Sequence, residues 1–280
     1  MPSRTALLTA AARGLHREEP PPWVLDDWLA LPLGGEEAVQ MSQTLRHQLP
    51  GPALLAFTRW VCVRGRHTEE IVESAAAAGV SQYVILGAGL DSFAYRRHDL
   101  LTRVRVFEVD HPASQQWKRR RLGELGIDPP ANLAYAPIDF ERRALRDGLA
   151  AAGFDFAAGA VWSWIGVTMY LTIEAIRATL ATIAMCLPGT RLVLSYNLPR
   201  TALNGLGLTL ATTMRAIVSE LGEPMISLFT PPEIEGLLLE LGYDEVTHFG
   251  PDEAQARYFA DRDDVHFGGV QRLVIATVAG

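Results

Sequence analysis

The sequence predicts an α/β fold built on a doubly wound parallel sheet. Short apolar, β-branched runs alternate with helical patterns through the middle of the chain, and the first run, Gln82 to Leu86, ends in Gly87-Ala88-Gly89. Helices of this length between strands imply βαβ crossovers and therefore parallel pairing. The stretch up to about Arg66 has helical spacing and no convincing strand. The sheet is therefore expected to begin after it.

The N-terminal stretch is predicted to be a helical cap on this sheet. Ala6 to Ala12 is apolar and indicates a short helix, and Pro20-Pro21-Pro22 is a stiff, polyproline-like break. Two further helical segments are separated by the strong punctuation of Pro50-Gly51-Pro52. They are Glu36 to Gln48 and Ala53 to Val63.

Seven strands and the helices between them are expected in the remainder. Five strands come before the character of the chain changes: Gln82 to Leu86, Arg103 to Asp110, Leu133 to Asp139, Ala160 to Val167 and Arg191 to Leu198. Helical patterns lie around them at Thr68 to Ala78, Pro112 to Leu125, Glu141 to Ala152 and Thr172 to Leu187. A long apolar helical insertion, Thr201 to Leu221, follows strand five. The chain then runs through a helix at Pro231 to Leu241, a strand at Tyr243 to Phe249, a helix near Glu253 to Ala260 and a last strand at Arg272 to Val278.

Composition narrows the classes of function. Among 280 residues, 25 Lys and Arg against 32 Asp and Glu give a net charge of −7, whereas nucleic-acid binders normally carry a basic excess. The basic run Lys118 to Arg121 is interpreted as the solvated face of a helix. No run approaches the length of a membrane span. The two cysteines, Cys62 and Cys186, cannot form a disulfide framework, so a reduced, cytoplasmic setting fits best.

Glycines and a carboxylate mark a binding site at the ends of the first two strands. In an open parallel sheet, ligands bind outside the carboxyl ends of the strands. Gly87, Ala88 and Gly89 follow the first strand, and Asp110 comes 21 residues after Gly89, where a carboxylate commonly holds ribose hydroxyls. Ser92 stands where the dinucleotide fingerprint needs a third glycine. This favours S-adenosylmethionine (SAM) over NAD(P), while a NAD(P)-dependent oxidoreductase and a purely structural turn remain open.

A second acidic position closes the third strand. Asp139 followed by Phe140 offers an acceptor for the amino group of adenine and a ring for stacking. An equally good interpretation makes Asp139 the N-cap of the helix that starts at Glu141.

Longer motifs carry a resemblance to a known family. The segments YVILGAGLDSFAYRR (83–97), VFEVDHPASQQWKRRRL (106–122), APIDFER (136–142), WSWIGVTMYLT (162–172), GEPMISLFTPPEIEGLLLELGY (222–243) and ARYFADRDD (256–264) resemble the leucine carboxyl methyltransferase family. The similarity is greatest to its bacterial branch of SAM-dependent O-methyltransferases. The resemblance implies a class I methyltransferase fold, with a Rossmann-like sheet of seven strands whose last strand is antiparallel. It also implies methylation of a carboxylate, or a hydroxyl, of a hydrophobic small molecule such as a secondary metabolite.

The pattern of strands and helices divides the chain, and the resemblance assigns cofactor residues. Residues 1–280 would form a single domain with a helical cap (1–66), a cofactor-binding core (67–198), a lid-like insertion (199–230) and C-terminal strands and helices (231–280). Gly87, Ala88 and Gly89 would form the turn that receives SAM, Asp110 would hold its ribose, and Asp139 with Phe140 would hold its adenine. Either Arg64 or Arg66 would hold its carboxylate, because a guanidinium meets a carboxylate with two hydrogen bonds. Ile165 replaces a glutamate found in the phosphatase-methylating branch, which favours a small-molecule acceptor.

The acceptor side has weaker signals. Tyr196 and Asn197, at the end of the fifth strand, and Arg257 with Tyr258, in the tail motif, are candidates for contact with the substrate. No obvious general base is present, and His111 is interpreted as structural, which favours a carboxylate that needs no base. Neither the histidines nor the cysteines have metal-ligand spacing. A non-catalytic SAM-binding relative stays open, and the oligomeric state is not predicted.

Overall fold

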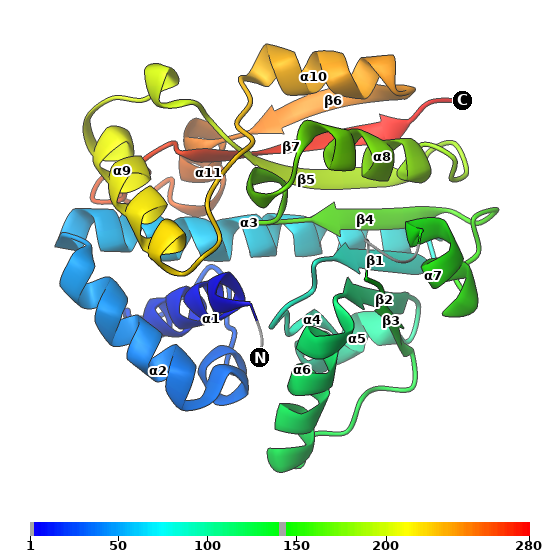
Figure 1. Cartoon of the computed structure of the whole chain (residues 1–280), viewed down its shortest axis with the longest axis horizontal. Coiled ribbons are helices and arrows are strands. Elements are labelled where there is room, and N and C mark those ends of the chain that lie inside the picture. Colours follow the sequence, from blue (N-terminus) through cyan, green and yellow to red (C-terminus); the bar gives the residue numbers. More distant parts are fainter. Residues whose placement is uncertain (1–2, 140–143) are drawn as a thin grey trace.

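A seven-stranded mixed sheet forms the centre of the computed structural model, which describes residues 3–139 and 144–280 (Figure 1). The strand order is β3-β2-β1-β4-β5-β7-β6. Strands β1 to β5 pair in parallel, and β7 is antiparallel to both of its neighbours. The predicted doubly wound sheet with an antiparallel last strand is therefore confirmed. The strands are β1 (Gln82–Leu86), β2 (Arg105–Asp110), β3 (Leu133–Pro137), β4 (Ala160–Trp164), β5 (Arg191–Asn197), β6 (Tyr243–Phe249) and β7 (Gln271–Val278).

Helices cover both faces of this sheet. Side chains alternate along β1, so that Tyr83 and Ile85 join one apolar cluster while Val84 and Leu86 join another. The first cluster includes residues of α3 and α6, and the second includes residues of α7, α8 and α10. The helices are α1 (Arg4–His16), α2 (Ala30–Gln48), α3 (Gly51–Ala77), α4 (Phe93–Arg96), α5 (His98–Leu101), α6 (Pro112–Glu124), α7 (Leu145–Ala151), α8 (Ile173–Ile183), α9 (Gly205–Glu220), α10 (Pro231–Glu240) and α11 (Pro251–Tyr258), with 3-10 turns η1 (Thr168–Tyr170) and η2 (Arg200–Ala202).

Helix α3 differs from the sequence-based expectation. It runs unbroken from the cap into the core, so the expected boundary between residues 66 and 67 falls inside it. The sequence pattern placed two helical segments here, Ala53 to Val63 and Thr68 to Ala78, with Gly65 between them, but one glycine costs a helix only about 1 kcal/mol. Helix α2 also begins earlier than expected and bends at Gly35, which has φ of 64°. The short helices α4 and α5 were not predicted.

A third apolar cluster joins parts of the chain that are far apart in sequence. Leu8 of α1, Leu45 of α2, Ala53 of α3 and Met214 of α9 all belong to it. Figure 1 shows α1, α2 and α9 gathered on the side toward which β1 and β4 run. These helices therefore stand over the carboxyl ends of the central strands. No helix in residues 3–139 and 144–280 is long and apolar enough to cross a membrane.

Candidate active site

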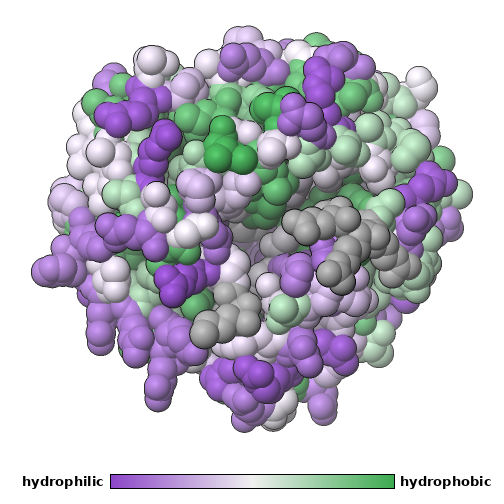
Figure 2. Space-filling model, viewed as in Figure 1, coloured by the Kyte–Doolittle hydropathy of each residue, from purple (hydrophilic) through white to green (hydrophobic). Residues whose placement is uncertain are grey.

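The main cavity opens at the carboxyl ends of β1 and β4, where the strand order reverses. Its volume is about 320 Å³, within the usual range of small-molecule sites. The loops after β1 and β4 form its floor, and α3 and the start of α1 form its walls. Figure 2 shows that this face of the molecule is hollowed near its middle. The cavity lies at the position that the strand pattern predicted for a ligand.

The glycine turn after β1 forms part of this cavity. The backbone N–H groups of Gly87 and Ala88 both donate to the carbonyl of Val109, over 2.8 and 3.0 Å, which turns the loop back onto β2. Gly87 has φ of +68° and Gly89 has φ of +48°. A Cβ at position 87 would lie only 2.5 Å from Cγ2 of Val167 in the loop after β4. Close contact between these two loops therefore requires glycine at this position.

Asp110 lines the same cavity at the end of β2. Its carboxylate accepts hydrogen bonds from the backbone N–H groups of Gly89, at 2.5 Å, and His111, at 2.6 Å. Burial raises the pKa of the Asp110 carboxyl, and these two hydrogen bonds oppose the shift. Further lone pairs of the carboxylate remain for a ligand. His111 caps α6 by accepting from the N–H of Ala113 over 3.2 Å, so it has the structural contact that was expected.

The segment after β3 runs beside Asp110. The N–H of Ile138 donates to the carbonyl of Asp110 over 2.9 Å, and Asp139 follows directly. Asp139 is not among the residues that line the main cavity. Phe140 lies outside the described residues.

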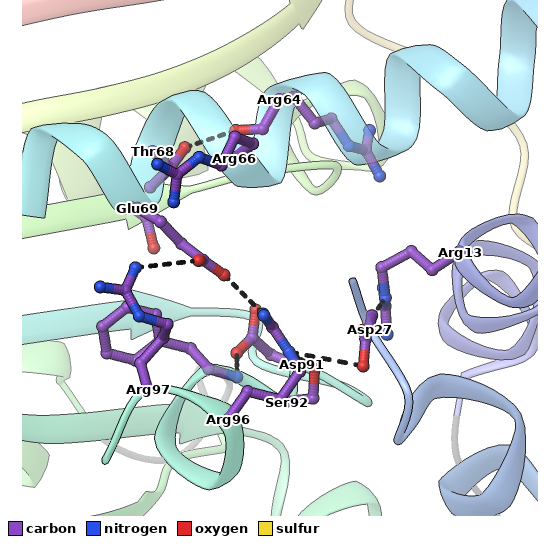
Figure 3. Close-up of polar contacts among 12 residues, drawn as sticks. Arg13, Asp27, Arg64, Arg66, Thr68, Glu69, Asp91, Ser92, Arg96 and Arg97 are labelled. Atoms are coloured by element: carbon purple, nitrogen blue, oxygen red, sulfur yellow. Dashed lines mark hydrogen bonds and ion pairs between the residues drawn. The ribbon is translucent and has the colours of Figure 1, made fainter. Parts of the chain in front are cut away.

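The structure separates the two candidate arginines. Figure 3 shows the side chains of Arg64 and Arg66 leaving α3 in different directions. Arg64 is buried, lines the cavity and donates from Nη1 to Oε1 of Gln271 over 2.6 Å. Arg66 is absent from the cavity wall and pairs with Glu70 and Glu73 at 3.2 and 3.1 Å.

The buried guanidinium of Arg64 is bonded to the neutral side chain of Gln271. Among the described residues, no carboxylate forms an ion pair with it. Burial, followed by repulsion from Arg13, lowers the pKa of Arg64 to about 10. A carboxylate entering the cavity would relieve both effects, because it would supply the missing opposite charge.

Sequence reasoning missed a group of buried charges on the cavity wall (Figure 3). Asp27 accepts from Nε of Arg13 over 2.6 Å and lies 3.5 Å from Nε of Arg96, which in turn pairs with Glu69 at 2.5 Å. Although burial raises it, the pKa of Asp27 is held below its ordinary value by the two guanidiniums. Arg13 and Asp27 lie 14 residues apart, in α1 and the loop after it, and match no motif. The spacing of Ala6 to Ala12 predicted a short helix there, but nothing in it placed Arg13 at the cavity.

A second, smaller cavity of about 80 Å³ adjoins the first, and we name it the apolar chamber. Thr5, Thr9, Val61, Arg64, Gly166 and Tyr170 line both cavities. Most of the remaining lining is apolar: Leu8, Ala56, Phe57, Trp60, Met169, Leu210, Met214, Met225, Phe267, Gly268, Gly269 and Val270, joined by Asn197 and Gln271. A polar cavity thus continues into an apolar one at Arg64.

Of the four candidate acceptor residues, one lines either of these two cavities. Asn197 lines the apolar chamber. Tyr196, its neighbour on β5, faces the other way, and its hydroxyl lies 2.9 Å from Nδ1 of His248. Arg257 and Tyr258 of α11 both donate to Glu70 of α3, over 2.8 and 2.9 Å, and line neither cavity. Ile165 lines the main cavity. Residues 3–139 and 144–280 contain no cluster of His, Cys, Asp and Glu that could hold a metal ion.

Known proteins match this chain in sequence and in structure. "Putative S-adenosyl-L-methionine-dependent methyltransferase YktD" of Bacillus subtilis (strain 168) is 30% identical over 94% of this chain and 93% of its own length. A "Putative S-adenosyl-L-methionine-dependent methyltransferase" of Mycobacterium avium (strain 104) is 36% identical over 68% of this chain and 63% of its own length.

Solved structures share the fold. A "putative methyltransferase from Thermobifida fusca YX" superposes with a TM-score of 0.61 at 20% identity, covering 89% of this chain and 92% of its own. A DUF574 family protein of Streptomyces avermitilis superposes with a TM-score of 0.65 at 15% identity, covering 100% and 98%. Residues 6–184 match the family described as leucine carboxyl methyltransferase. The chain therefore belongs to the leucine carboxyl methyltransferase family, as its motifs indicated.

Proposed function

We propose that this chain transfers the methyl group of SAM to the carboxylate of a hydrophobic small molecule. That it is a SAM-dependent methyltransferase follows from its family and from a relative that aligns along nearly its whole length. The acceptor atom and the class of acceptor are the proposal, and they are argued from the two cavities.

The residues of the main cavity fit SAM. The carboxylate of Asp110 stands at the end of β2 to accept from the ribose hydroxyls, and Gly87 to Gly89 leave the backbone open to close approach. Arg64 supplies a buried guanidinium for the carboxylate of the amino-acid part. Of the two arginines, the geometry favours Arg64, because Arg66 is already paired at the far side of α3. Asp139 remains our candidate for adenine. When bound, SAM supplies a methyl group activated by a positively charged sulfur.

The observation that carries the carboxylate proposal is the absence of a base in the apolar chamber. Among its described lining residues, only Arg64 and Tyr170 can titrate. Burial, followed by the negative charge of Glu223, raises the pKa of Tyr170 to about 12, so this phenol stays protonated at neutral pH. An alcohol or phenol would need a base to become a nucleophile, whereas a carboxylic acid is already ionised.

The chain would accelerate this reaction mainly by alignment and by exclusion of water. Charge is neutralised as the methyl group moves from sulfur to oxygen, and water stabilises the separated charges better than the transition state. The apolar chamber adjoins the polar cavity, so it would exclude water from the acceptor and hold it in line with the methyl donor.

Binding and transfer measurements test the proposal. Asp110→Ala should weaken binding of S-adenosylhomocysteine, the product of SAM, by about 1 to 3 kcal/mol in calorimetry, because the ribose loses a charged acceptor. Asp128→Ala, an exposed carboxylate on the loop after α6, is the matched control and should bind normally. Unchanged affinity in a folded Asp110→Ala protein would contradict the site.

Radiolabelled methyl transfer then tests the acceptor. Apolar carboxylic acids should become methyl esters, and the matching alcohols should not. Methylation of the alcohols alone would overturn the carboxylate proposal. Binding of S-adenosylhomocysteine with no transfer to any acid would indicate a non-catalytic relative, and preference for NADPH would indicate a reductase.

A further inference from the structure

Three hydrogen bonds join four side chains into a network that forms part of the polar lining of the apolar chamber. Trp60 of α3 donates from Nε1 to Oε1 of Gln271 over 3.2 Å, and Arg64 donates to the same oxygen over 2.6 Å. Gln271 of β7 donates from Nε2 to Oδ1 of Asn197 over 2.8 Å. All four residues line the chamber. This hydrogen-bond network therefore extends from α3, through β7, to the end of β5.

The direction of these hydrogen bonds is fixed by groups that can only donate. An indole N–H and a guanidinium have no acceptor atom, so both require the oxygen of the Gln271 amide. The nitrogen of Gln271 therefore faces Asn197 and donates to the Asn197 side-chain oxygen. The side-chain nitrogen of Asn197 is consequently the free end of the hydrogen-bond network.

That free end is poorly satisfied. Nδ2 of Asn197 donates only to Sδ of Met225, over 3.4 Å, among the described residues, and a thioether is a weak acceptor. The residue is only 4% exposed, so bulk water does not compensate it. An amide donor with a fixed direction thus lies in a mostly apolar chamber, and it lacks a good oxygen acceptor.

We propose that Asn197 recognises an oxygen of the acceptor carboxylate through Nδ2, and that Gln271 is the positioning residue that keeps this donor turned into the chamber. This inference rests on the proposed function, because it identifies the group that holds the methyl acceptor. The chamber is small, and the flexible side chains of Met169, Met214 and Met225 can adapt to different shapes. The acceptor class is therefore a compact apolar monocarboxylic acid, with its carboxylate at Asn197 and its hydrocarbon part among the methionines and aromatic rings.

An acid and its primary amide provide a direct test. In the presence of saturating S-adenosylhomocysteine, binding of 3-phenylpropanoic acid and of 3-phenylpropanamide is measured by ligand-observed NMR titration, with no turnover required. The wild type should prefer the acid. Asn197→Asp exchanges the donor for an acceptor, so affinity for the acid should fall at least about tenfold and the preference should reverse in favour of the amide. A variant that merely damaged packing would weaken both probes alike.

Further variants separate the contributions. Asn197→Ser removes the donor without adding a charge, and it should lose affinity for the acid while keeping its affinity for S-adenosylhomocysteine within about twofold. Gln271→Met keeps the bulk but releases Asn197 to turn its oxygen into the chamber, so the ratio of acid to amide affinity should fall. Asn204→Asp repeats the chemical change at an exposed position before α9 and should match the wild type.

Each result decides between the two proposals. If the wild type did not bind S-adenosylhomocysteine, the proposed function would be overturned, and this inference with it. Intact cofactor binding with no binding of either probe would overturn the chamber as the acceptor site. Equal preference for the acid in wild type and Asn197→Asp would overturn the role of Asn197 and leave the proposed function standing.

Discussion

Nζ of Lys118 lies 2.7 Å from Oε2 of Glu108, and both side chains are buried, with exposed fractions of 1% and 0%. Lys118 also donates to the carbonyl of Asp91 over 2.5 Å. The pair thus links α6 to β2 and to the loop after β1, part of which lines the main cavity. Burial raises the pKa of Glu108, and the neighbouring ammonium opposes the shift. This ion pair supports the wall of the cofactor site from behind.

Lys118→Met should destabilise the protein by about 3 to 5 kcal/mol in urea unfolding, because it leaves an uncompensated carboxyl in the core. The pKa of Glu108 should rise further, and the carboxyl should become protonated. The double variant Glu108→Gln, Lys118→Met removes both charges and should recover part of the loss. A double variant as unstable as the single one would show that the lysine acts through packing and not through charge.

The Lys118 result also shows where a charge pattern stops being informative. The run from Lys118 to Arg121 predicts a solvated helix face, and the side chain of Arg120 is indeed largely exposed. Lys118 instead turns inward to Glu108, on the strand before the helix. Four consecutive residues point around the whole circumference of a helix, so a basic run cannot show which of its members meets a buried acid.

The sheet was predictable because each strand is short, apolar and bounded by turn residues, which are local properties. The continuity of α3 was less visible. Gly65 lies among charged residues between the two expected segments, and a Cβ there would come within 3.2 Å of Leu25, from a loop forty residues earlier. The kink at Gly35 likewise concealed the first turn of α2.

The cofactor site was partly predictable for the same reason. Gly87, Gly89 and Asp110 follow strand ends, and strand ends meet at one edge of a parallel sheet. Arg13, Asp27 and Gln271 come from α1, a loop and β7, and only tertiary packing brings them to the cavities. No spacing rule connects residues that are more than two hundred positions apart.

Arg64→Met should weaken binding of S-adenosylhomocysteine by about 1.5 to 3 kcal/mol, because a charged hydrogen bond to the carboxylate is lost. Binding of 5′-methylthioadenosine, which lacks the amino-acid part, should change little. Arg66→Met is the matched control on the same helix, and it should leave both affinities near the wild-type values. The assignment would be reversed if calorimetry found the loss in Arg66→Met instead.

His67 should make stability depend on pH. Its ring stacks on Phe249 with 3.8 Å between centroids, and its Nδ1 lies 3.2 Å from the hydroxyl of Tyr258. Burial lowers the pKa of His67 to about 4; Glu70 opposes the shift and Arg257 adds to it. Between pH 6.5 and 4 the unfolded chain therefore binds a proton at His67 that the folded chain does not. The contribution of the neutral ring to the free energy of unfolding is fully present above pH 6.5 and is lost as the pH falls toward 4.

The size of this effect follows from a comparison with His67→Gln. On going from pH 7 to pH 5, the wild type should lose about 1 to 2 kcal/mol more than the variant in urea unfolding, after allowance for solvent screening of the half-buried ring. Using the difference between the two proteins removes the titration of groups that they share. Parallel curves of stability against pH would show that His67 is protonated in the folded state as readily as in the unfolded one.

Glu223 should hold the start of α1 over the main cavity. Its carboxylate accepts from Oγ of Ser3 at 2.9 Å, from the N–H of Arg4 at 3.0 Å and from Oγ1 of Thr5 at 2.5 Å. Ser3, Thr5 and Glu223 all line the cavity, and a negative charge at a helix N-terminus is favourable.

Glu223→Ala should therefore lower stability by about 1 to 2 kcal/mol and accelerate amide hydrogen exchange in the first turn of α1 roughly tenfold. S-Adenosylhomocysteine should dissociate several-fold faster in stopped-flow experiments, because this wall opens more often. Glu220→Ala, an exposed change at the end of α9, should alter none of these quantities. Hydrogen exchange in α1 that is unchanged by Glu223→Ala would mean that packing against α2 and α3 alone keeps this helix in place.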